Sequence, residues 1–399
     1  MGNTPNIRFK GFTDDWEQRK LGDWGDFYYG RSCPKWSVTE DATIPCIRYG
    51  ELYTKFGAKI DRVYSYTNMP PENLRFSKGT EVLIPRVGED PMDYNHCTWL
   101  SMKDVAIGEM ISVFNTDNNP LFTATMFNAT LQNEFAMRVE GGSVTNLYFE
   151  KLKNIDVSFP SIREQEMIAA YFENIDNLIT LHQRKCDETK KLKKFMLQKM
   201  FPKKDAKKPE IRFAGFTNDW EQRKLMEVAE YRNGKAHENE INDDGEYIVV
   251  NSKFVSTNGE IRKFSYAQNE PLYENEIAFV LSDVPNGRAI ARTFLVDKSG
   301  KYTLNQRIAG ITPHEDTDPY YLYIKMNRNE YFLKFDDGNK QTNLSIKDVL
   351  NYEDMYPSYK EQQKIGMYFQ QLDHLITLHQ RKCDELKEFK KYMLQNMFP

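Results

Sequence analysis

The sequence predicts a mixed α/β protein in which two α/β domains are joined by two long antiparallel coiled-coil helices, arranged as an internal pseudo-two-fold repeat. Residues 7–21 return as 211–225, with changes only at Lys10/Ala214 and Asp14/Asn218. Residues 178–188 return unchanged as 375–385, inside a long amphipathic stretch in both copies. The segments between these blocks differ, so the repeat predicts one scaffold that carries two different surfaces.

Length and composition limit the class of protein. The 399 residues are enough for two or three domains with cores of their own, and the formal net charge is only −4. Five cysteines, an odd number without a Cys-x-x-Cys pair, indicate a reduced cytoplasmic protein without disulfides. No apolar run approaches the ~20 residues of a membrane span, and the polar N-terminus does not predict a signal peptide.

The first variable region, 23–150, follows a shared N-terminal segment, 1–22. It is punctuated by Gly and Pro and is rich in short runs of β-forming residues. These runs predict strands at 44–49, 80–86 and 105–113, and a short helix is expected within 118–132.

A long helix is predicted over 159–202. Ser161 and Glu164 have the spacing of a capping box, and no Gly or Pro occurs from there to Phe201. A stretch of nearly 40 helical residues would be ~55–60 Å long. Its C-terminal half is lysine-rich and is expected to be mostly solvated. The predicted apolar seam contains Ile168, Tyr171, Phe172, Ile175, Leu178, Ile179, His182, Cys186, Thr189, Leu192, Lys193, Met196 and Met200.

The second copy follows the same plan. A linker and the repeated segment occupy 203–225, a second variable region occupies 226–347, and a second long helix is predicted over 356–399 with one interruption at Gly366. Two long amphipathic helices most simply bury their stripes against each other, and pseudo-two-fold placement makes the pair antiparallel. Strands are predicted at 247–251, 276–281, 289–295 and 307–311.

Several catalytic and cofactor motifs do not occur in the sequence. There is no Gly-x-x-x-x-Gly-Lys-Ser/Thr, no Gly-x-Gly-x-x-Gly and no His-Glu-x-x-His. The stretch 119–122 (Asn-Pro-Leu-Phe) lacks the second proline of an amino-methyltransferase box. The pairs His182/Cys186 and His379/Cys383 could form a zinc site if the helices crossed there, or lie in the helix seam as core residues. We predict no metal, because no local ligand cluster accompanies them.

Basic residues gather near predicted strand ends in both variable regions. Lys and Arg suit DNA phosphates, and Arg, Asn and Gln suit base edges. The second region also carries Lys235 and the run 305–307 (Asn-Gln-Arg) in this group. The candidate DNA contacts are Arg31, Lys35, Arg48, Lys55 and Arg86 in the first region and Lys253, Arg262, Lys263, Arg288 and Arg292 in the second.

The layout resembles the specificity subunit of type I restriction–modification systems over essentially the whole chain. Residues 159–165 (Phe-Pro-Ser-Ile-Arg-Glu-Gln) and 356–362 (Tyr-Pro-Ser-Tyr-Lys-Glu-Gln) are similar to that family's P-x-x-x-E-Q-x-x-I segment. The Thr-Asn-Leu runs at 145–147 and 342–344 and the Trp-Glu-Gln-Arg-Lys-Leu runs at 16–21 and 220–225 also fit. Residues 79–86 resemble the family's DNA-facing strand, whereas 275–282 depart from it and lack an obvious counterpart of Arg86.

The resemblance implies a non-catalytic DNA-binding subunit. Each variable region would be a target recognition domain that reads one half of a bipartite, asymmetric site in double-stranded DNA. The helices would dock two methyltransferase subunits, which bring S-adenosylmethionine, and two restriction/translocase subunits would join with ATP and Mg. No cofactor is expected on this chain. The alternatives are a self-sufficient DNA methyltransferase or nuclease, and a structural coiled-coil adaptor.

Overall fold

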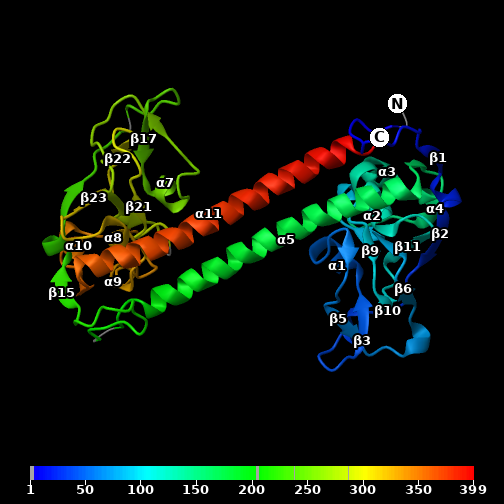
Figure 1. Cartoon of the computed structure of the whole chain (residues 1–399), viewed down its shortest axis with the longest axis horizontal. Helices are drawn as coiled ribbons and strands as arrows, with labels where there is room; N and C mark the ends of the chain where they lie inside the picture. Colours follow the sequence, from blue (N-terminus) through cyan, green and yellow to red (C-terminus); the bar gives the residue numbers. More distant parts are fainter. Residues whose placement is uncertain (1–3, 204–205, 238, 286) are drawn as a thin grey trace. The chain divides into compact units, whose positions relative to one another are not determined.

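The computed structural model describes residues 4–203, 206–237, 239–285 and 287–399, so Lys204 and Asp205 of the predicted linker lie outside the described residues. The chain forms two compact units. Unit 1 combines Met1–Gln183 with Arg381–Pro399, and unit 2 is Arg184–Gln380. Each contains one α/β domain and parts of both long helices (Figure 1), which confirms the predicted fold class.

Two sheets build the α/β domain of unit 1. One has the strand order β2-β11-β7-β9-β4 and the other β5-β3-β10-β6, and a small sheet has the order β12-β13-β8. Every residue of β7 is buried, which fits its position inside the larger sheet. The strands are β2 (Gly25–Tyr29), β3 (Ile44–Ile47), β4 (Lys59–Ile60), β5 (Ser65–Thr67), β6 (Phe76–Lys78), β7 (Glu81–Pro85), β8 (Val87–Gly88), β9 (Thr98–Leu100), β10 (Lys103–Ile107), β11 (Ile111–Thr116), β12 (Glu140–Gly141) and β13 (Thr145–Asn146).

Helix α2 (Pro120–Thr130) packs against strands β7 and β9 of the larger sheet and confirms the short helix predicted within 118–132. It begins where Asn119 Oδ1 accepts a hydrogen bond from Phe122 N (2.9 Å), with proline at the first helical position. Phe122 is fully buried in a core that also contains Trp16 and Phe159. The other helical segments are α1 (Tyr49–Thr54), α3 (Gln132–Ala136), α4 (Phe149–Leu152), η1 (Leu21–Asp23), η2 (Lys35–Ser37), η3 (Pro71–Asn73) and η4 (Pro91–Asp93).

Unit 2 has related topology with fewer strands. Its larger sheet has the order β16-β23-β19-β21, and two smaller sheets have the orders β18-β17-β22 and β20-β24. The strands are β16 (Ala229–Asn233), β17 (Tyr247–Val250), β18 (Phe264–Ser265), β19 (Ile277–Val280), β20 (Ser282–Asp283), β21 (Thr293–Leu295), β22 (Tyr302–Leu304), β23 (Ile308–Pro313) and β24 (Thr342–Asn343). The helices are α6 (Leu225–Val228), α7 (Ser252–Ser256), α8 (Pro319–Met326), α9 (Glu330–Leu333) and α10 (Ile346–Leu350).

The repeated block that contains Trp-Glu-Gln-Arg-Lys-Leu forms the same two-stranded ribbon in each unit. In unit 1, β1 (Glu17–Lys20) pairs antiparallel with β14 (Asp156–Phe159), and Glu17 lies opposite Phe159. In unit 2, β15 (Glu221–Lys224) pairs with β25 (Glu353–Tyr356), and Glu221 lies opposite Tyr356. Trp16 and Trp220, one residue before each ribbon, are buried. The repeated sequence therefore encodes a ribbon that closes each domain against its core.

Two of the predicted strands are wrong in detail. The run 105–113 contains two strands, β10 and β11, separated by a turn at 108–110. Gly108 lies at this turn, where its backbone N–H donates to Ile47 O (2.9 Å) and a Cβ would lie 3.0 Å from the same oxygen. Of the run 289–295, only Thr293–Leu295 forms a strand, because Ala291 has a left-handed backbone (φ 55°) that ends the extended conformation.

The long helices are α5 (Ile162–Lys199) and α11 (Tyr359–Asn396), and they pack together antiparallel as predicted. In unit 1, Lys390 Nζ pairs with Asp176 Oδ1 (2.6 Å), and Cys383 Sγ lies 4.0 Å from Ile179 O. Unit 2 repeats both contacts at the equivalent positions. There Lys193 pairs with Asp373 (2.6 Å), and Cys186 Sγ lies 3.8 Å from Ile376 O.

The seam differs from the prediction at two leucines. Leu178 and Leu192 are 44% and 45% exposed, whereas Ile168, Phe172, Ile175 and Cys186 are buried. The C-terminal half of α5 is mostly exposed, as predicted, and in the lysine-rich run 190–194 only Lys193 is partly buried. Met196, Leu197 and Met200, near its end, pack into the core of unit 2.

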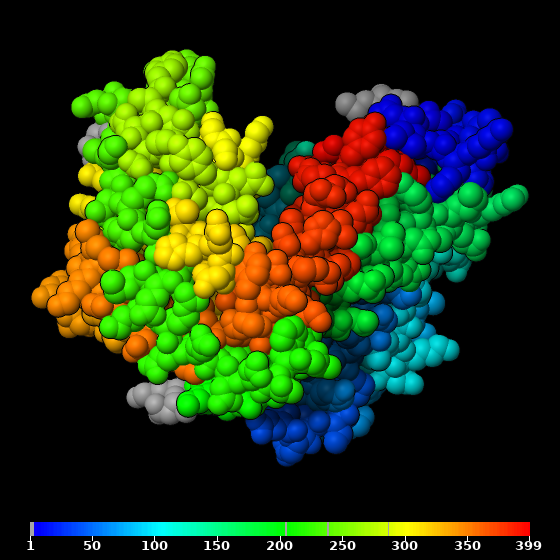
Figure 2. Space-filling view, turned by 60° about the vertical axis from the view of Figure 1, so that its left-hand side comes forward, coloured from blue at the N-terminus to red at the C-terminus, as the bar shows by residue number. Residues whose placement is uncertain are grey.

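The repeated Ile-Arg-Phe segments attach to the long helices through paired charges. In unit 1, Arg8 binds both carboxylate oxygens of Glu164 (2.7 and 2.8 Å). In unit 2, Arg212 binds Glu361 in the same way (2.7 Å for both bonds). Figure 2 shows the N-terminal segment (blue) against the C-terminal end of α11 (red) in unit 1, where Ile7 N donates to Asn396 O (2.8 Å).

This pairing corrects the expected capping box. Both oxygens of the Glu164 carboxylate bind Arg8, so Glu164 serves the N-terminal segment, and the start of α5 is closed by backbone bonds from Glu164 N and Gln165 N to Ser161 O. The adjacent Gln165 has a second role. Its Oε1 accepts from Asn119 N (2.9 Å), which fixes the start of α2 against α5, and Gln362 does the same for Asp318 N (3.1 Å) in unit 2.

Candidate nucleic-acid interface

A turn between β10 and β11 gathers three of the candidate arginines in unit 1. Arg31 N donates to Ile107 O (2.8 Å), and Arg86 N donates to Met110 O (3.2 Å). Gly108 N donates to Ile47 O, directly before Arg48. The strands β2, β3 and β7 therefore end around this turn. We call Arg31, Arg48, Arg86 and the turn 107–110 the first strand-end cluster.

Arg86 is the most constrained residue of this cluster. Its guanidinium carbon lies 4.5 Å from the ring centroid of Tyr29 and 5.4 Å from that of Tyr148. Nη1 donates to Glu109 O (3.3 Å), whereas Nε is buried and has no hydrogen-bond partner among the described residues. Glu89 and Asp90 lie close to Arg86 in the sequence, and a salt bridge to either would give this side chain a structural role. Neither carboxylate is within ion-pair distance of Arg86 in the described part of the chain.

Tyr29 is itself held in place. Its hydroxyl donates to Glu150 Oε2 (2.8 Å), and its ring lies 4.4 Å from that of Phe149. Burial of the hydroxyl and the hydrogen bond to Glu150 raise the pKa of Tyr29 to about 12, so it stays a neutral ring beside Arg86. Tyr148 and Glu150 were missed in the sequence. Tyr148 directly follows the Thr-Asn-Leu run, whose strand β13 pairs with β8, the strand after Arg86. This pairing, which brings Tyr148 to Arg86, is not visible in the sequence.

The other candidates of unit 1 are less constrained. Arg31 is exposed, and Arg48 is half-buried at the start of α1, where its N–H donates to Glu51 Oε2 (2.9 Å). Lys35 is exposed on η2, and Lys55 is exposed at the end of α1, 5.8 Å from the ring centroid of Tyr64. The structure thus brings Arg31, Arg48 and Arg86 to one turn, and places Lys35 and Lys55 on neighbouring short helices.

Unit 2 has an equivalent turn with different side chains. Lys235 N donates to Leu304 O (3.1 Å), Asn305 N to Val250 O (3.1 Å) and Leu281 N to Arg307 O (3.0 Å). These bonds match those of Arg31, Gly108 and Arg86 in unit 1, so Leu281 occupies the position of Arg86. We call Lys235, Lys253 and the turn 304–307 the second strand-end cluster. Lys253 is exposed on α7, and Arg307 is exposed with a left-handed backbone (φ 67°).

The remaining candidates of unit 2 lie on two loops. Arg288 and Arg292 belong to the loop between β20 and β21, where Arg292 Nε donates to Arg288 O (2.6 Å). Asp283 holds this loop by accepting from Ala289 N (2.6 Å) and Ile290 N (3.1 Å). Arg262 and Lys263 are exposed beside β18, and Arg262 Nε donates to Gly259 O (2.8 Å). No contact joins these four residues to the second cluster among the described residues.

One arginine of the variable regions is structural. Arg232 binds Glu276 (2.5 and 2.6 Å) and Glu270 (3.0 Å). Burial opposes ionisation of Glu276, but hydrogen bonds from Arg232, Tyr273 N and the Thr312 hydroxyl hold its pKa below the ordinary value. This charge pair lies within the domain and is not available to a ligand.

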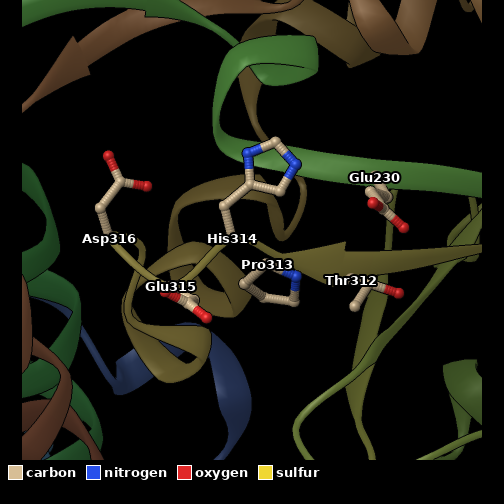
Figure 3. Close-up of a pocket in the computed structure, with 6 residues that line it drawn as sticks. All are labelled: Glu230, Thr312, Pro313, His314, Glu315 and Asp316. Carbon is tan, nitrogen blue, oxygen red and sulfur yellow. The ribbon is translucent and has the colours of Figure 1, made fainter.

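One hollow in the described part of unit 2 is acidic. It has a volume of about 520 Å³ and is lined by Glu230, Thr312, Pro313, His314, Glu315 and Asp316 (Figure 3). Three carboxylates repel phosphate, so this hollow does not fit a nucleic acid backbone. Among the described residues, no group of three or more His, Cys, Asp or Glu side chains could hold a metal ion, and none of the helices is long and apolar enough to cross a membrane.

Comparisons with known proteins agree with this architecture. A family model described as "Type I restriction modification DNA specificity domain" matches residues 13–191 and 217–388. The chain is 26% identical over 276 residues to the type I restriction enzyme MjaVIII specificity subunit of Methanocaldococcus jannaschii. That alignment covers 64% of this chain and 64% of the relative, so the chain spans less than two thirds of the relative's length.

Two solved structures share the fold. The type I restriction-modification system S subunit from M. genitalium superposes with a TM-score of 0.67 at 14% identity, over 99% of each chain. A chain from a structure on complex assembly and conformational transition of the type I R-M system gives a TM-score of 0.52 at 15% identity, over 96% of this chain and 97% of that one. At these identities the likeness establishes the architecture alone.

Proposed function

The chain belongs to the family of type I restriction modification DNA specificity domains, and from this premise we propose that it is the DNA specificity subunit of a type I restriction–modification complex. One observation carries the proposal. The two copies share their ribbon and helix contacts position by position, whereas the turns that gather basic residues differ in sequence. The ribbons and long helices are repeated, but the strand-end clusters that they carry differ. Such a protein is suited to an asymmetric target with two different half-sites.

Each α/β domain acts as a target recognition domain in this proposal. The first strand-end cluster presents Arg31, Arg48 and Arg86, and the second presents Lys235, Lys253 and Arg307. Arginine and lysine supply phosphate contacts, and arginine also reads base edges. Other loops and short helices of the same domains carry further proposed DNA contacts: Lys35, Lys55, Arg262, Lys263, Arg288 and Arg292.

The long helices supply the proposed docking sites for methyltransferase subunits. In unit 1, Leu178 and Leu181 of α5 and Tyr392 of α11 are exposed by 44%, 37% and 55%. The equivalent residues of unit 2, Leu375, Leu378 and Phe195, are exposed to similar extents. Exposed apolar side chains at matched positions favour association with a partner. Two equivalent rows predict two equivalent methyltransferase subunits, and two restriction/translocase subunits complete the complex.

The chain has no catalytic role in this proposal. Methyl transfer, ATP-driven translocation and cleavage belong to the partners, which carry S-adenosylmethionine, ATP and Mg. The complex acts on DNA in the cytoplasm. The competing function, a self-sufficient methyltransferase or nuclease, would need a cofactor loop or metal cluster that the described strand-end clusters do not form.

DNA binding by the purified chain, with and without its methyltransferase partner, separates these functions. The proposal predicts sequence-specific binding in the complex and adenine methylation only when the methyltransferase is present. Methylation or cleavage by the chain alone would contradict it. Sequencing methylated adenines in DNA from cells that carry the complex should give a bipartite, asymmetric motif.

A further inference from the structure

Arg86 lies in an environment that the fold of the first domain does not require. A buried N–H donor normally has a hydrogen-bond partner. Arg86 has one hydrogen bond to a described residue, at 3.3 Å from Nη1 to Glu109 O, and its buried Nε has none. The side chain is therefore held mainly by its two aromatic neighbours.

Those neighbours fix its direction. Tyr29 and Tyr148 lie close to the guanidinium, with centroid distances of 4.5 and 5.4 Å. They come from different parts of the domain, since Tyr29 ends β2 and Tyr148 precedes α4. Each cation–π contact stabilises the observed position of the guanidinium without using its N–H donors. The donors of Nη1 and Nη2 that Glu109 does not occupy remain for an external acceptor.

Planar pairs of N–H donors match few partners in DNA. In the major groove, guanine presents O6 and N7 as two adjacent acceptors, and a bidentate arginine is the commonest contact with them. A phosphate also accepts two N–H bonds from arginine, but a phosphate contact carries no sequence information. Fixing the orientation of an arginine between two rings strengthens a contact with two aligned acceptors of a base edge more than it strengthens a contact with a phosphate.

The second domain shows what the fold needs at this position. Leu281 makes the same backbone bonds as Arg86: its N–H donates to Arg307 O (3.0 Å), and its carbonyl accepts from Leu344 N (2.8 Å). Leu281 is 8% exposed and belongs to the core of unit 2. Asn233 and Ser345 occupy the positions of Tyr29 and Tyr148. The arginine and both rings are thus absent together from the second domain, as expected for parts of one device.

We propose that the first recognition domain reads a guanine in the major groove through Arg86, which Tyr29 and Tyr148 hold in position. The second domain, with Leu281 at the equivalent position, reads its half-site without an arginine there. The inference rests on the proposed function and adds the base that one half-site must contain, as well as the residue that selects it.

Arg86→Lys tests this reading most sharply. Lysine keeps the charge but loses the planar pair of donors, so a guanine contact would lose discrimination at one base pair, whereas a phosphate contact would at most weaken binding to all sequences alike. The measurement is binding of the complex with its methyltransferase partner to a library in which each position of the motif is varied in turn. We expect discrimination to fall by roughly 5- to 150-fold at one G·C pair in one half-site, with other positions unchanged.

Variants of the rings test the positioning role. Tyr148→Leu and Tyr29→Leu should relax the same base position, because the guanidinium loses its fixed direction. Tyr29→Phe keeps the ring and should keep the discrimination. Arg75→Lys is the matched control, since Arg75 also lies over a tyrosine ring (4.8 Å from Tyr28) and at this edge, but is exposed and bonds Tyr29 O. It should leave that base position unchanged.

The outcomes separate the inference from the function on which it rests. If the wild-type complex shows no sequence-specific binding, the proposed function is wrong. If the wild-type complex is specific but Arg86→Lys changes no single position, or weakens binding to all sequences alike, only the guanine reading is overturned. A wild-type motif without a G·C pair in the half-site of the first domain would also overturn it.

Discussion

The cores of the two units use the same positions of the repeat but different side chains. In unit 1, Met126 of α2 and Val157 of β14 are buried in an apolar core. At the equivalent positions of unit 2 stand Lys325 of α8 and Asp354 of β25, with Lys325 Nζ 3.0 Å from Asp354 Oδ2. A charge pair therefore replaces two apolar side chains within otherwise matching cores.

The surroundings of Lys325 show how a buried charge is accommodated. Its side chain is 2% exposed, and Nζ lies between 5.0 and 5.9 Å from the ring centroids of Tyr356, Phe201, Tyr321 and Trp220. Burial lowers the pKa of Lys325, and the Asp354 carboxylate opposes this shift. Unit 1 forms the equivalent core without either charge, so the fold does not need this pair.

The largest expected effect comes from breaking the pair. Asp354→Val alone leaves Lys325 charged and unpaired, and should cost about 3–5 kcal/mol of the free energy of unfolding. The double variant Lys325→Met/Asp354→Val restores the two apolar side chains of unit 1 and should recover most of this loss; the remainder is the hydrogen bond from the Tyr352 hydroxyl to Asp354 Oδ2 (2.6 Å). Chemical denaturation of the three proteins measures both effects. A double variant as unstable as Asp354→Val would show that the two cores are not interchangeable.

The Arg–Glu pairs that attach the repeated segments should behave alike. Arg8→Ala leaves Glu164, which is 1% exposed, without its cation, and Arg212→Ala does the same to Glu361. Each should cost about 2–3 kcal/mol, because a buried carboxylate loses two charge-assisted hydrogen bonds. Each variant is the control for the other. Denaturation measures the loss in the free energy of unfolding for each variant. Unequal losses would mean that one unit depends more on its Ile-Arg-Phe segment than the other.

Acid should distinguish the two recognition domains. Glu276 binds Arg232, whereas Tyr28 stands at the position of Arg232 in the first domain. Because the pKa of Glu276 is lower in the folded chain than the unfolded value of about 4.3, the unfolded chain binds more protons as the pH falls. This contribution to stability is present above about pH 4.3 and is lost as the pH falls through the folded pKa. Glu276→Gln should flatten this loss in denaturation experiments between neutral and acidic pH, and an unchanged slope would assign the acid sensitivity to other groups.

The long helices and the repeat were predictable because their signals are local and extended. Both 38-residue helices show apolar periodicity, and the repeated blocks identify equivalent positions without any structure. The seam was less predictable. The apolar residues of α5 lie on two sides of the helix, and periodicity cannot tell which side faces α11, so Leu178 and Leu192 were assigned to the wrong one.

The candidate site was predictable only in part. Arg86 could be chosen because it follows a β run, which places it at a strand end. The two rings beside Arg86 could not be predicted, because Tyr29 and Tyr148 reach it through sheet pairing between segments that are far apart in the sequence. The break of 105–113 at Gly108 was hidden for a related reason. β-forming residues flank the turn on both sides, and only the packing against Ile47 shows where the chain reverses.

Matched insertions in the helices should leave both units intact. Each unit contains a segment of α5 and the facing segment of α11, so four residues inserted after Gln183 and four after Gln380 preserve the pairs Asp176–Lys390 and Lys193–Asp373. Four residues add ~6 Å and nearly one turn. We expect little loss of stability and an unread spacer longer by roughly two base pairs, measured by methylation mapping. An insertion in α5 alone, between Glu188 and Met200, shifts Lys193 and Met196 and should be destabilising.

The most direct test of the account is an exchange of residues 226–347 for the equivalent region of another member of the family. Two recognition domains on a repeated framework should each read one half-site independently of the other. Methylation mapping of the chimaera should therefore show one half of the motif replaced and the other half identical to that of the wild type. If both halves change in an active chimaera, the two domains do not read their half-sites independently, and the account is contradicted.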